Sequence, residues 1–125
     1  RVEEALAEGR PVFVDFTGVT CTNCKYNELS VFPRPEVADL LRRFEVVQLY
    51  TDEVPAAAYQ SEPGEAARAA EARVNRDFQL AAFQDIALPL YVVLMPQPDG
   101  RLKVLGKYEE GKINDPAKFM AFLKG

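Results

Sequence analysis

The most reactive groups in the sequence are two thiols, which stand three positions apart at Cys21 and Cys24. The chain contains no histidine, which excludes Ser-His and Cys-His nucleophile pairs, histidine-ligated zinc and histidine acid-base catalysis. Any chemistry must therefore come from thiols, carboxylates, lysines, tyrosines or the backbone. The C-x-x-C spacing allows a short disulfide, and it lets the second thiol expel a substrate from a mixed disulfide with the first.

Two other interpretations of the cysteine pair stay open. A C-x-x-C motif can supply half of a zinc site, but without histidine or further cysteines the tetrahedral shell needs carboxylates or a second chain. A purely structural disulfide would close a very small loop, and such a loop gives little entropic stabilisation. We therefore predict a redox-active dithiol and no metal site.

The segment before the cysteines is expected to be a strand that leads into a helix. Residues 11–16 form an apolar, β-branched and aromatic run without alternation, which is typical of a central strand buried on both faces. A helical pattern then begins near Asn23 or Cys24. A thiol at a helix N-terminus meets unpaired N–H groups and the positive end of the helix dipole, which stabilise the thiolate. We expect Cys21 to attack and Cys24 to resolve the mixed disulfide.

The first half of the chain predicts alternating helices and strands. A short helix is expected over residues 2–8, with Gly9 as its end, and the helix after the cysteines is broken at Pro33. Pro35 can open a further helix, which is followed by a strand over residues 46–51. This strand-helix-strand unit predicts parallel strands with a right-handed crossover.

The second half adds a crossover helix, a hairpin and a last helix. Residues 52–72 are predicted as a peripheral excursion, and about residues 65–80 as a helix with one buried face. Strands over 90–95 and 102–106 form a hairpin around the turn at 98–100. The residues expected on buried helix faces are Val74, Phe78 and Ala81 in the crossover helix and Phe119, Phe122 and Leu123 in the last helix, which Asn114 or Asp115 caps before Pro116.

Length and composition limit the domain count and the partners. With 125 residues, 48% of them apolar and 27% charged, the chain is expected to form a single domain over residues 1–125. Its net charge of -4 argues against nucleic acid, because phosphate binding needs a basic surface. The apolar runs fall far short of the roughly 18 residues of a membrane-spanning helix, so we expect no direct membrane insertion. The first residue is Arg1 and no export signal is visible, which suggests a processed product or a domain of a larger protein.

The sequence resembles the thioredoxin superfamily, and within it the C-terminal domain of the DsbD thiol:disulfide interchange family. The superfamily likeness is carried by residues 12–18, the motif Cys21-x-x-Cys24-Lys25 and the pair Leu88-Pro89, and the subgroup likeness by Glu28, Phe32 and Pro35. The likeness to the superfamily covers nearly the whole chain. The resemblance implies an α/β, thioredoxin-like fold, with a central mixed sheet of about four strands and helices on both faces.

The resemblance also implies roles for single residues. Asp15 falls at the family's buried aspartate, where an apolar setting should raise its pKa and make it a proton acceptor for the resolving thiol; a solvated or structural aspartate is the alternative. Glu28 shares the helix face of Cys24 and would add negative charge that keeps this thiol protonated, unless it is an exposed helix glutamate. Pro89 resembles the family's cis-proline, and Leu88 before it offers backbone groups to an extended substrate strand.

Thr20, Thr22 and Asn23 complete the expected substrate-binding set with Leu88 and Pro89. Thr20 stands where many relatives carry a tryptophan, and the chain has none, so the aromatic contact surface of those relatives does not transfer. Thr22 and Asn23 replace the Gly-Pro pair of well-known thioredoxins, so their reduction potential does not transfer either.

The implied function is that of a protein-disulfide oxidoreductase, an enzyme that reduces disulfides through its dithiol and needs no cofactor beyond the redox-active disulfide. A DsbD-like domain, expected as a monomer, would receive electrons from a membrane-embedded donor and pass them to disulfide-containing proteins. This implies an extracytoplasmic, periplasmic location, with a cytoplasmic one left open. The alternatives are a free-standing thioredoxin-like reductase or isomerase, and a non-enzymatic thioredoxin-fold binding module.

Overall fold

Strand β1 (Val12–Thr17) lies at the centre of the fold in the computed structural model, which describes residues 9–52 and 65–125. All six residues of β1 are buried, as the mainly apolar run without alternation predicts. It pairs in parallel with β2 (Glu45–Tyr50) and antiparallel with β3 (Leu90–Pro96). The helix expected over residues 2–8 lies outside the described residues.

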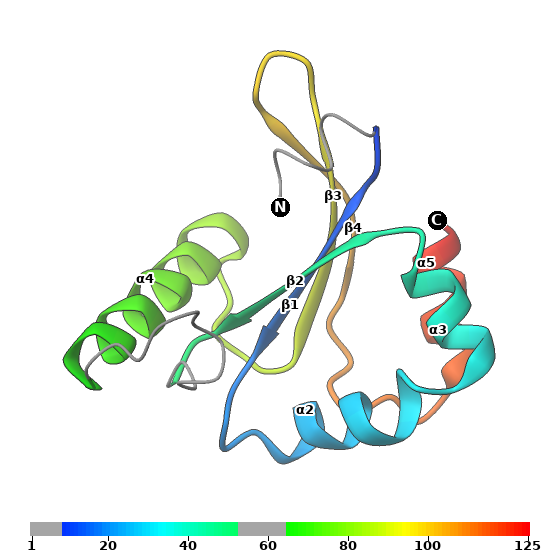
Figure 1. Cartoon of the computed structure of the whole chain (residues 1–125), viewed down its shortest axis with the longest axis horizontal. Helices are drawn as coiled ribbons and strands as arrows, with labels where there is room; N and C mark the ends of the chain where they lie inside the picture. Colours follow the sequence, from blue (N-terminus) through cyan, green and yellow to red (C-terminus); the bar gives the residue numbers. More distant parts are fainter. Residues whose placement is uncertain (1–8, 53–64) are drawn as a thin grey trace.

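The described strands form one mixed sheet in the order β2-β1-β3-β4 (Figure 1). β3 and β4 (Leu102–Tyr108) make the predicted antiparallel hairpin. The turn between them holds Gly100 at a φ of 85°, a conformation that glycine adopts without a steric penalty. The parallel pairing of β1 with β2 confirms the strand-helix-strand unit.

One face of the sheet carries the helical segments that follow the cysteines and the last helix. These are α2 (Thr22–Tyr26), the π-helical segment η1 (Asn27–Val31) that continues it, α3 (Pro35–Leu41) and α5 (Pro116–Lys124). Phe13 projects from β1 into their core, where its ring contacts those of Phe32, Tyr91 and Phe119. Because side chains alternate along a strand, Asp15 and Thr17 face the same side.

The last helix begins as the sequence predicts. The Asp115 carboxylate caps it by accepting hydrogen bonds from the N–H groups of Ala117 and Lys118, and Pro116 occupies its first turn. Phe119 and Leu123 are buried in the core, with Phe122 packed partly against it. The core face predicted for α5 is therefore confirmed.

The opposite face of the sheet is covered by α4 (Glu65–Phe83), so helices lie on both faces, as the thioredoxin-like fold requires (Figure 1). Val12, Val14 and Phe16 of β1 form the core on this side with apolar residues of β3. The part of the predicted excursion from residue 65 to residue 72 belongs to α4. None of the helices in the described ranges combines the length and the apolar composition that a membrane crossing needs.

The buried face of α4 differs from the predicted one. Val74 is 65% exposed and Ala81 is also exposed, so the prediction is wrong for these two residues. Phe78 is 40% exposed, but its ring lies 5.8 Å from that of the buried Phe16 in β1. The side chain of Asn75 instead donates to the Tyr50 carbonyl, and that of Gln79 donates to the Ala87 carbonyl, each at 2.9 Å. Polar residues share the inner face with Phe78 and Phe83 because these two carbonyls, at the end of β2 and in the loop before β3, need donors.

We predict that Ala72→Gln and Val74→Gln have unequal effects on stability. Ala72 is 2% exposed, so a larger polar side chain there should lower the free energy of unfolding by about 1–3 kcal/mol. The same change at exposed Val74 should alter it by less than about 0.5 kcal/mol. Urea denaturation measures both values. A larger loss at Val74 than at Ala72 would restore the apolar stripe as the packed face.

Candidate active site

Cys21 and Cys24 form a disulfide at the start of α2, with their Cα atoms 5.3 Å apart. Cys21 is the N-cap residue of α2, and its Sγ accepts a hydrogen bond from the Cys24 N–H at 3.1 Å. Cys21 is partly exposed, whereas Cys24 is completely buried. A partner can therefore reach Cys21, while Cys24 can react only with a sulfur that is already bound there. This asymmetry matches the attacking and resolving roles predicted for the two cysteines.

The loop that leads to Cys21 makes a close turn at Gly18. The Cys21 N–H donates to the Gly18 carbonyl at 3.2 Å. A Cβ atom on Gly18 would lie 2.8 Å from Oδ2 of Asp52 and 3.1 Å from Cδ1 of Leu88. Only glycine allows the loop, the Asp52 carboxylate and the Leu88 side chain to approach this closely.

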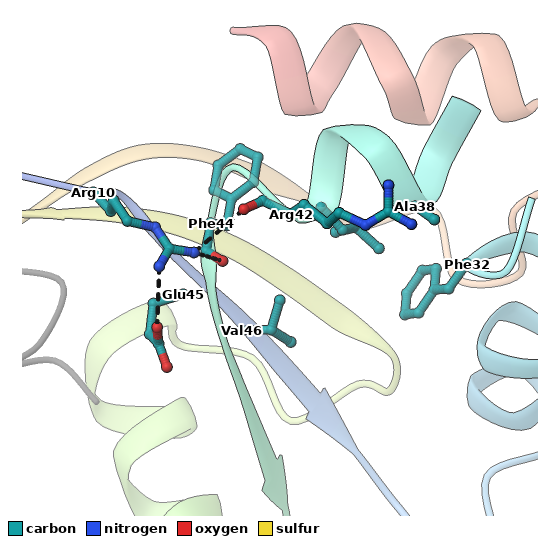
Figure 2. Close-up of a pocket in the computed structure, with 8 residues that line it drawn as sticks. Arg10, Phe32, Ala38, Arg42, Phe44, Glu45 and Val46 are labelled. Atoms are coloured by element: carbon teal, nitrogen blue, oxygen red, sulfur yellow. Dashed lines mark hydrogen bonds and ion pairs between the residues drawn. The ribbon is translucent and has the colours of Figure 1, made fainter. Parts of the chain in front are cut away.

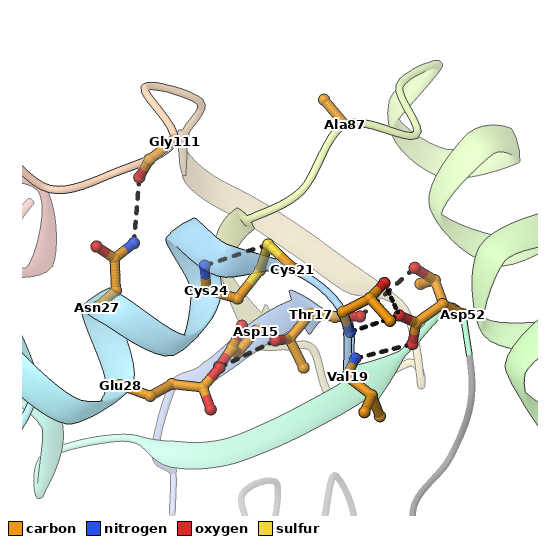
Figure 3. Close-up of a disulfide and its surroundings, with 12 residues drawn as sticks. Asp15, Thr17, Val19, Cys21, Cys24, Asn27, Glu28, Asp52, Ala87 and Gly111 are labelled. Carbon is orange, nitrogen blue, oxygen red and sulfur yellow. Dashed lines mark hydrogen bonds between the residues drawn. A yellow bond between two sulfur atoms is a disulfide. The ribbon is translucent and has the colours of Figure 1, made fainter.

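Asp52 holds this loop in place from the end of β2. Its carboxylate accepts hydrogen bonds from the N–H groups of Val19 and Thr20, at 2.9 and 3.0 Å, and from the Thr20 hydroxyl at 2.9 Å (Figure 3). The composition of residues 52–72 places Asp52 in a peripheral excursion, but the structure places its side chain at the disulfide loop. No local pattern marks it, because these bonds join residues more than 30 positions apart.

Asp15 is buried on β1. It faces the side of the sheet that carries α2 and η1, which together form the disulfide helix (residues 22–31). It is 1% exposed, and its Oδ2 accepts a long hydrogen bond of 3.5 Å from Gln48. Burial raises the pKa of Asp15 to about 7, with a further increase from the negative charge of Glu28 and a small decrease from Gln48. Asp15 is therefore not a solvated residue, and its carboxyl exchanges protons near neutral pH.

Glu28 lies on η1 and is half-buried rather than exposed. Its Oε2 accepts a hydrogen bond of 2.9 Å from the hydroxyl of Thr17, which follows Asp15 on the same face of β1. Figure 3 shows both carboxylates on the interior side of the disulfide. The structure thus brings Asp15 and Glu28 together below Cys24.

The peptide bond between Leu88 and Pro89 is cis, as the resemblance implies. Pro89 is buried, and Leu88 packs against the core beneath α4. The approach of Leu88 to Gly18 brings this loop against the loop that leads to Cys21. Gln79, which is completely buried on α4, donates to the Ala87 carbonyl just before the cis bond.

The other predicted substrate-binding residues lie on the solvent side of the disulfide. Thr20, Thr22 and Asn23 are all exposed. Asn23 lies beside the loop between β4 and α5, since a Cβ atom on Gly111 would be 3.9 Å from the Asn23 Nδ2. These three neighbours of the disulfide on its solvent side are uncharged.

Asn27 is a site residue that sequence reasoning missed. It is completely buried, and its amide donates to the Tyr91 hydroxyl at 2.8 Å and to the Gly111 carbonyl at 3.1 Å. Its Oδ1 accepts from the Ile113 N–H at 2.9 Å. Asn27 thus ties the disulfide helix to β3 and to the loop that contacts Asn23. An asparagine within an otherwise helical stretch was the only available signal.

A separate surface hollow of about 720 Å³ lies between α3 and the edge strand β2 (Figure 2). Arg10 crosses it, donating to the Phe44 carbonyl at 2.6 Å and pairing with Glu45 at 3.7 Å. None of the predicted site residues lines it. Within residues 9–52 and 65–125, no three metal-ligating side chains of cysteine, aspartate or glutamate gather in one place.

Comparison with known families gives one match, to a family described as thioredoxin-like, over residues 1–96. That match includes β1, both cysteines and the cis peptide bond. No curated protein matches the chain.

Several solved structures share the fold. A thioredoxin from Thermus thermophilus is 23% identical with a TM-score of 0.69, over 98% of this chain and 78% of that one. A DsbH oxidoreductase is 18% identical with a TM-score of 0.62, over 98% of this chain and 78% of that one. The oxidised C-terminal domain of DsbD from Neisseria meningitidis is 19% identical with a TM-score of 0.53, over 98% of this chain and 87% of that one.

We predict that Asp15→Asn stabilises the oxidised protein increasingly as the pH rises. The ordinary pKa of 3.8 applies in the unfolded chain and about 7 in the folded one, so the folded state binds the proton more tightly. Stability is therefore lost between these values and the loss is complete above pH 7. Asparagine avoids this loss, which amounts to as much as about 4 kcal/mol. Urea denaturation from pH 4 to pH 8 measures the difference; exposed Asp77→Asn is the control, and a pH-independent difference for Asp15→Asn would contradict the account.

We predict that Asn27→Leu costs more stability than Tyr91→Phe. Leucine leaves the Ile113 N–H and the Gly111 carbonyl without partners, which should lower the free energy of unfolding by about 3 kcal/mol. Phenylalanine at position 91 removes one hydroxyl, at about 1 kcal/mol. Urea denaturation of both variants at one pH tests the order, and equal losses would show that Asn27 does not hold the loop.

Proposed function

The chain belongs to the thioredoxin-like family, and on that premise we propose that it is a protein-disulfide oxidoreductase that reduces partner disulfides through Cys21 and Cys24. The observation that carries the proposal is the asymmetric disulfide, with one reachable sulfur at the N-terminus of a helix and one buried sulfur. A structural disulfide needs no such asymmetry. It also needs no buried carboxyl that titrates near neutral pH.

The first step is attack by the reduced Cys21 thiolate on a sulfur of the partner's disulfide. The partner's S–S bond breaks, a mixed disulfide to Cys21 forms, and the other partner sulfur leaves as a thiolate. The Cys24 N–H, which lies 3.1 Å from the Cys21 Sγ, stabilises the Cys21 thiolate before attack, because it donates to the charged sulfur. This lowers the proton affinity of Cys21 relative to that of Cys24.

The second step is resolution of the mixed disulfide by Cys24. The Cys24 thiol gives its proton to the Asp15 carboxylate, and the resulting thiolate attacks the Cys21 sulfur. The Cys21–Cys24 disulfide forms and the partner leaves as its second thiolate, so the partner gains two electrons and this chain loses two. A proton acceptor works best when its pKa lies near the working pH, and burial raises the pKa of Asp15 to about 7.

Substrate contacts in this proposal come from the residues around Cys21. The backbone of Leu88 before the cis bond to Pro89 pairs with an extended segment of the partner, next to Thr20, Thr22 and Asn23. After each cycle a dithiol must reduce the Cys21–Cys24 disulfide again, which returns two electrons to the domain.

The finer proposal concerns the pathway. We assign the domain to a DsbD-like relay, in which a membrane-embedded dithiol supplies the electrons and disulfide-containing proteins outside the cytoplasm receive them. The similar folds of the DsbD C-terminal domain and the DsbH oxidoreductase support this assignment. The reaction needs no cofactor, and we propose that the domain acts as a monomer.

We predict that reduction of insulin, with dithiothreitol as the electron source, depends on both cysteines. Cys21→Ser should abolish the protein-dependent rate, because no other thiol can attack first. Cys24→Ser should lower turnover at least about 100-fold, because only an external thiol can then cleave the mixed disulfide. Turbidity from the released insulin chains measures the rate. Exposed Ser30→Ala, on the same helical segment, is the control, and full activity of Cys21→Ser would refute the mechanism.

A further inference from the structure

Two carboxylates of the site, Asp15 and Glu28, lie in one region between β1 and the disulfide helix that is largely shielded from solvent. Asp15 is 1% exposed and Glu28 is half-buried. The charge of Glu28 raises the pKa of Asp15, and it also raises the pKa values of Tyr50 and Tyr91. The negative charge of Glu28 therefore adds to the effect of burial, which is the larger cause of the raised pKa of Asp15.

The hydrogen-bond donors around the two carboxylates are unequal. Thr17 is 1% exposed, and its hydroxyl donates to the Glu28 Oε2 at 2.9 Å. Among the described side chains, only Gln48 donates a hydrogen bond to Asp15, and this bond is longer, at 3.5 Å. A short bond from a buried hydroxyl stabilises the ionised form of its acceptor. The geometry therefore fixes the Glu28 carboxylate at Thr17, whereas Asp15, the carboxyl with the raised pKa, has the weaker donor.

We propose that Thr17 is a positioning residue whose hydroxyl holds the Glu28 carboxylate turned toward Asp15, so that Asp15 holds the proton released by Cys24. Thr17 touches no reacting sulfur in this scheme and acts through Glu28. The only transfer involved is that of one proton from the Cys24 thiol to the Asp15 carboxylate. The catalytic part of the inference rests on the proposed function, whereas the arrangement of charges is a property of the oxidised protein.

Other titratable groups that face this pair do not compete for the proton near neutral pH. Tyr50 projects from β2 and Tyr91 from β3, and both have pKa values raised above that of free tyrosine, by burial first and by nearby carboxylates second. Cys24 on α2 does not titrate while it is in the disulfide. Titration of Asp15 in the oxidised protein therefore reports on Glu28 and on the hydroxyl that holds it.

The test compares Thr17→Val with Thr17→Ser in the oxidised chain. Valine has the shape of threonine without the hydroxyl, and serine keeps the hydroxyl without the methyl group. The pH midpoint of the Asp15 carboxyl carbon, followed by 13C NMR, is the readout. In Thr17→Val, Glu28 loses the hydroxyl that holds it and can turn to solvent, which weakens its repulsion of Asp15. We expect the Asp15 midpoint to fall by about one pH unit, a tenfold increase in the acidity constant, in Thr17→Val.

Thr17→Ser should keep the Asp15 midpoint of the unmodified chain. A third variant, Glu28→Gln, removes the charge itself and should lower the Asp15 midpoint at least as far as Thr17→Val. Adding Thr17→Val to Glu28→Gln should then produce no further fall, because the hydroxyl acts only through the Glu28 charge. An unchanged midpoint in Thr17→Val would overturn the proposal. So would a fall that persists in the Glu28→Gln background, since that would indicate a general loss of packing.

Failure of this inference is distinguishable from failure of the proposed function, because the NMR titration needs no catalysis. If the unmodified chain does not reduce insulin, the proposed function fails whatever the titration shows. If it does reduce insulin, the pH midpoint of turnover should move to lower pH in Thr17→Val and stay in place in Thr17→Ser. Equal pH profiles for these two variants would overturn the role of Thr17 in the reaction.

Discussion

The burial of a carboxyl group within β1 is the constraint on which the site depends. Every residue of that strand is buried, so the Asp15 side chain has no access to bulk water and its charged form is disfavoured. The pKa rises to about 7 for this reason first and because of Glu28 second. A carboxyl in this state destabilises the fold above neutral pH. In the proposed mechanism, its position below the disulfide makes this carboxyl the proton acceptor for the buried thiol.

Polar side chains from other elements fix the loops around the disulfide. Asp52 binds the loop before Cys21, Gln79 binds the Ala87 carbonyl before the cis bond, and Asn27 binds the loop at Gly111. Gln79 and Asn27 are completely buried, so their bonds are shielded from water. Loops with few apolar residues cannot be held by packing alone. The site is thus positioned by hydrogen bonds anchored in the helices and at the end of a strand.

Local patterns in the sequence predict most of the elements, because these depend on residues near each other in the chain. The buried strand at β1, the hairpin of β3 and β4, and the cap at Asp115 are of this kind. The face of α4 was mispredicted at Val74 and Ala81 because apolar periodicity does not reveal that two distant carbonyls need donors. Asp52 and Asn27 were not identified because their bonds join segments as far as 86 positions apart. The C-x-x-C motif was informative because its chemistry is contained within one turn of helix.

The central claim is that Cys21 attacks and Cys24 resolves, and trapping of the mixed disulfide tests it most directly. The reduced Cys21→Ser and Cys24→Ser variants are each mixed with a short peptide that contains one disulfide, and intact mass and peptide mapping locate any adduct. The account predicts a stable one-to-one adduct on Cys21 in Cys24→Ser. It predicts little adduct in Cys21→Ser, because Cys24 is completely buried. An adduct that forms faster on Cys24 than on Cys21 would contradict the account.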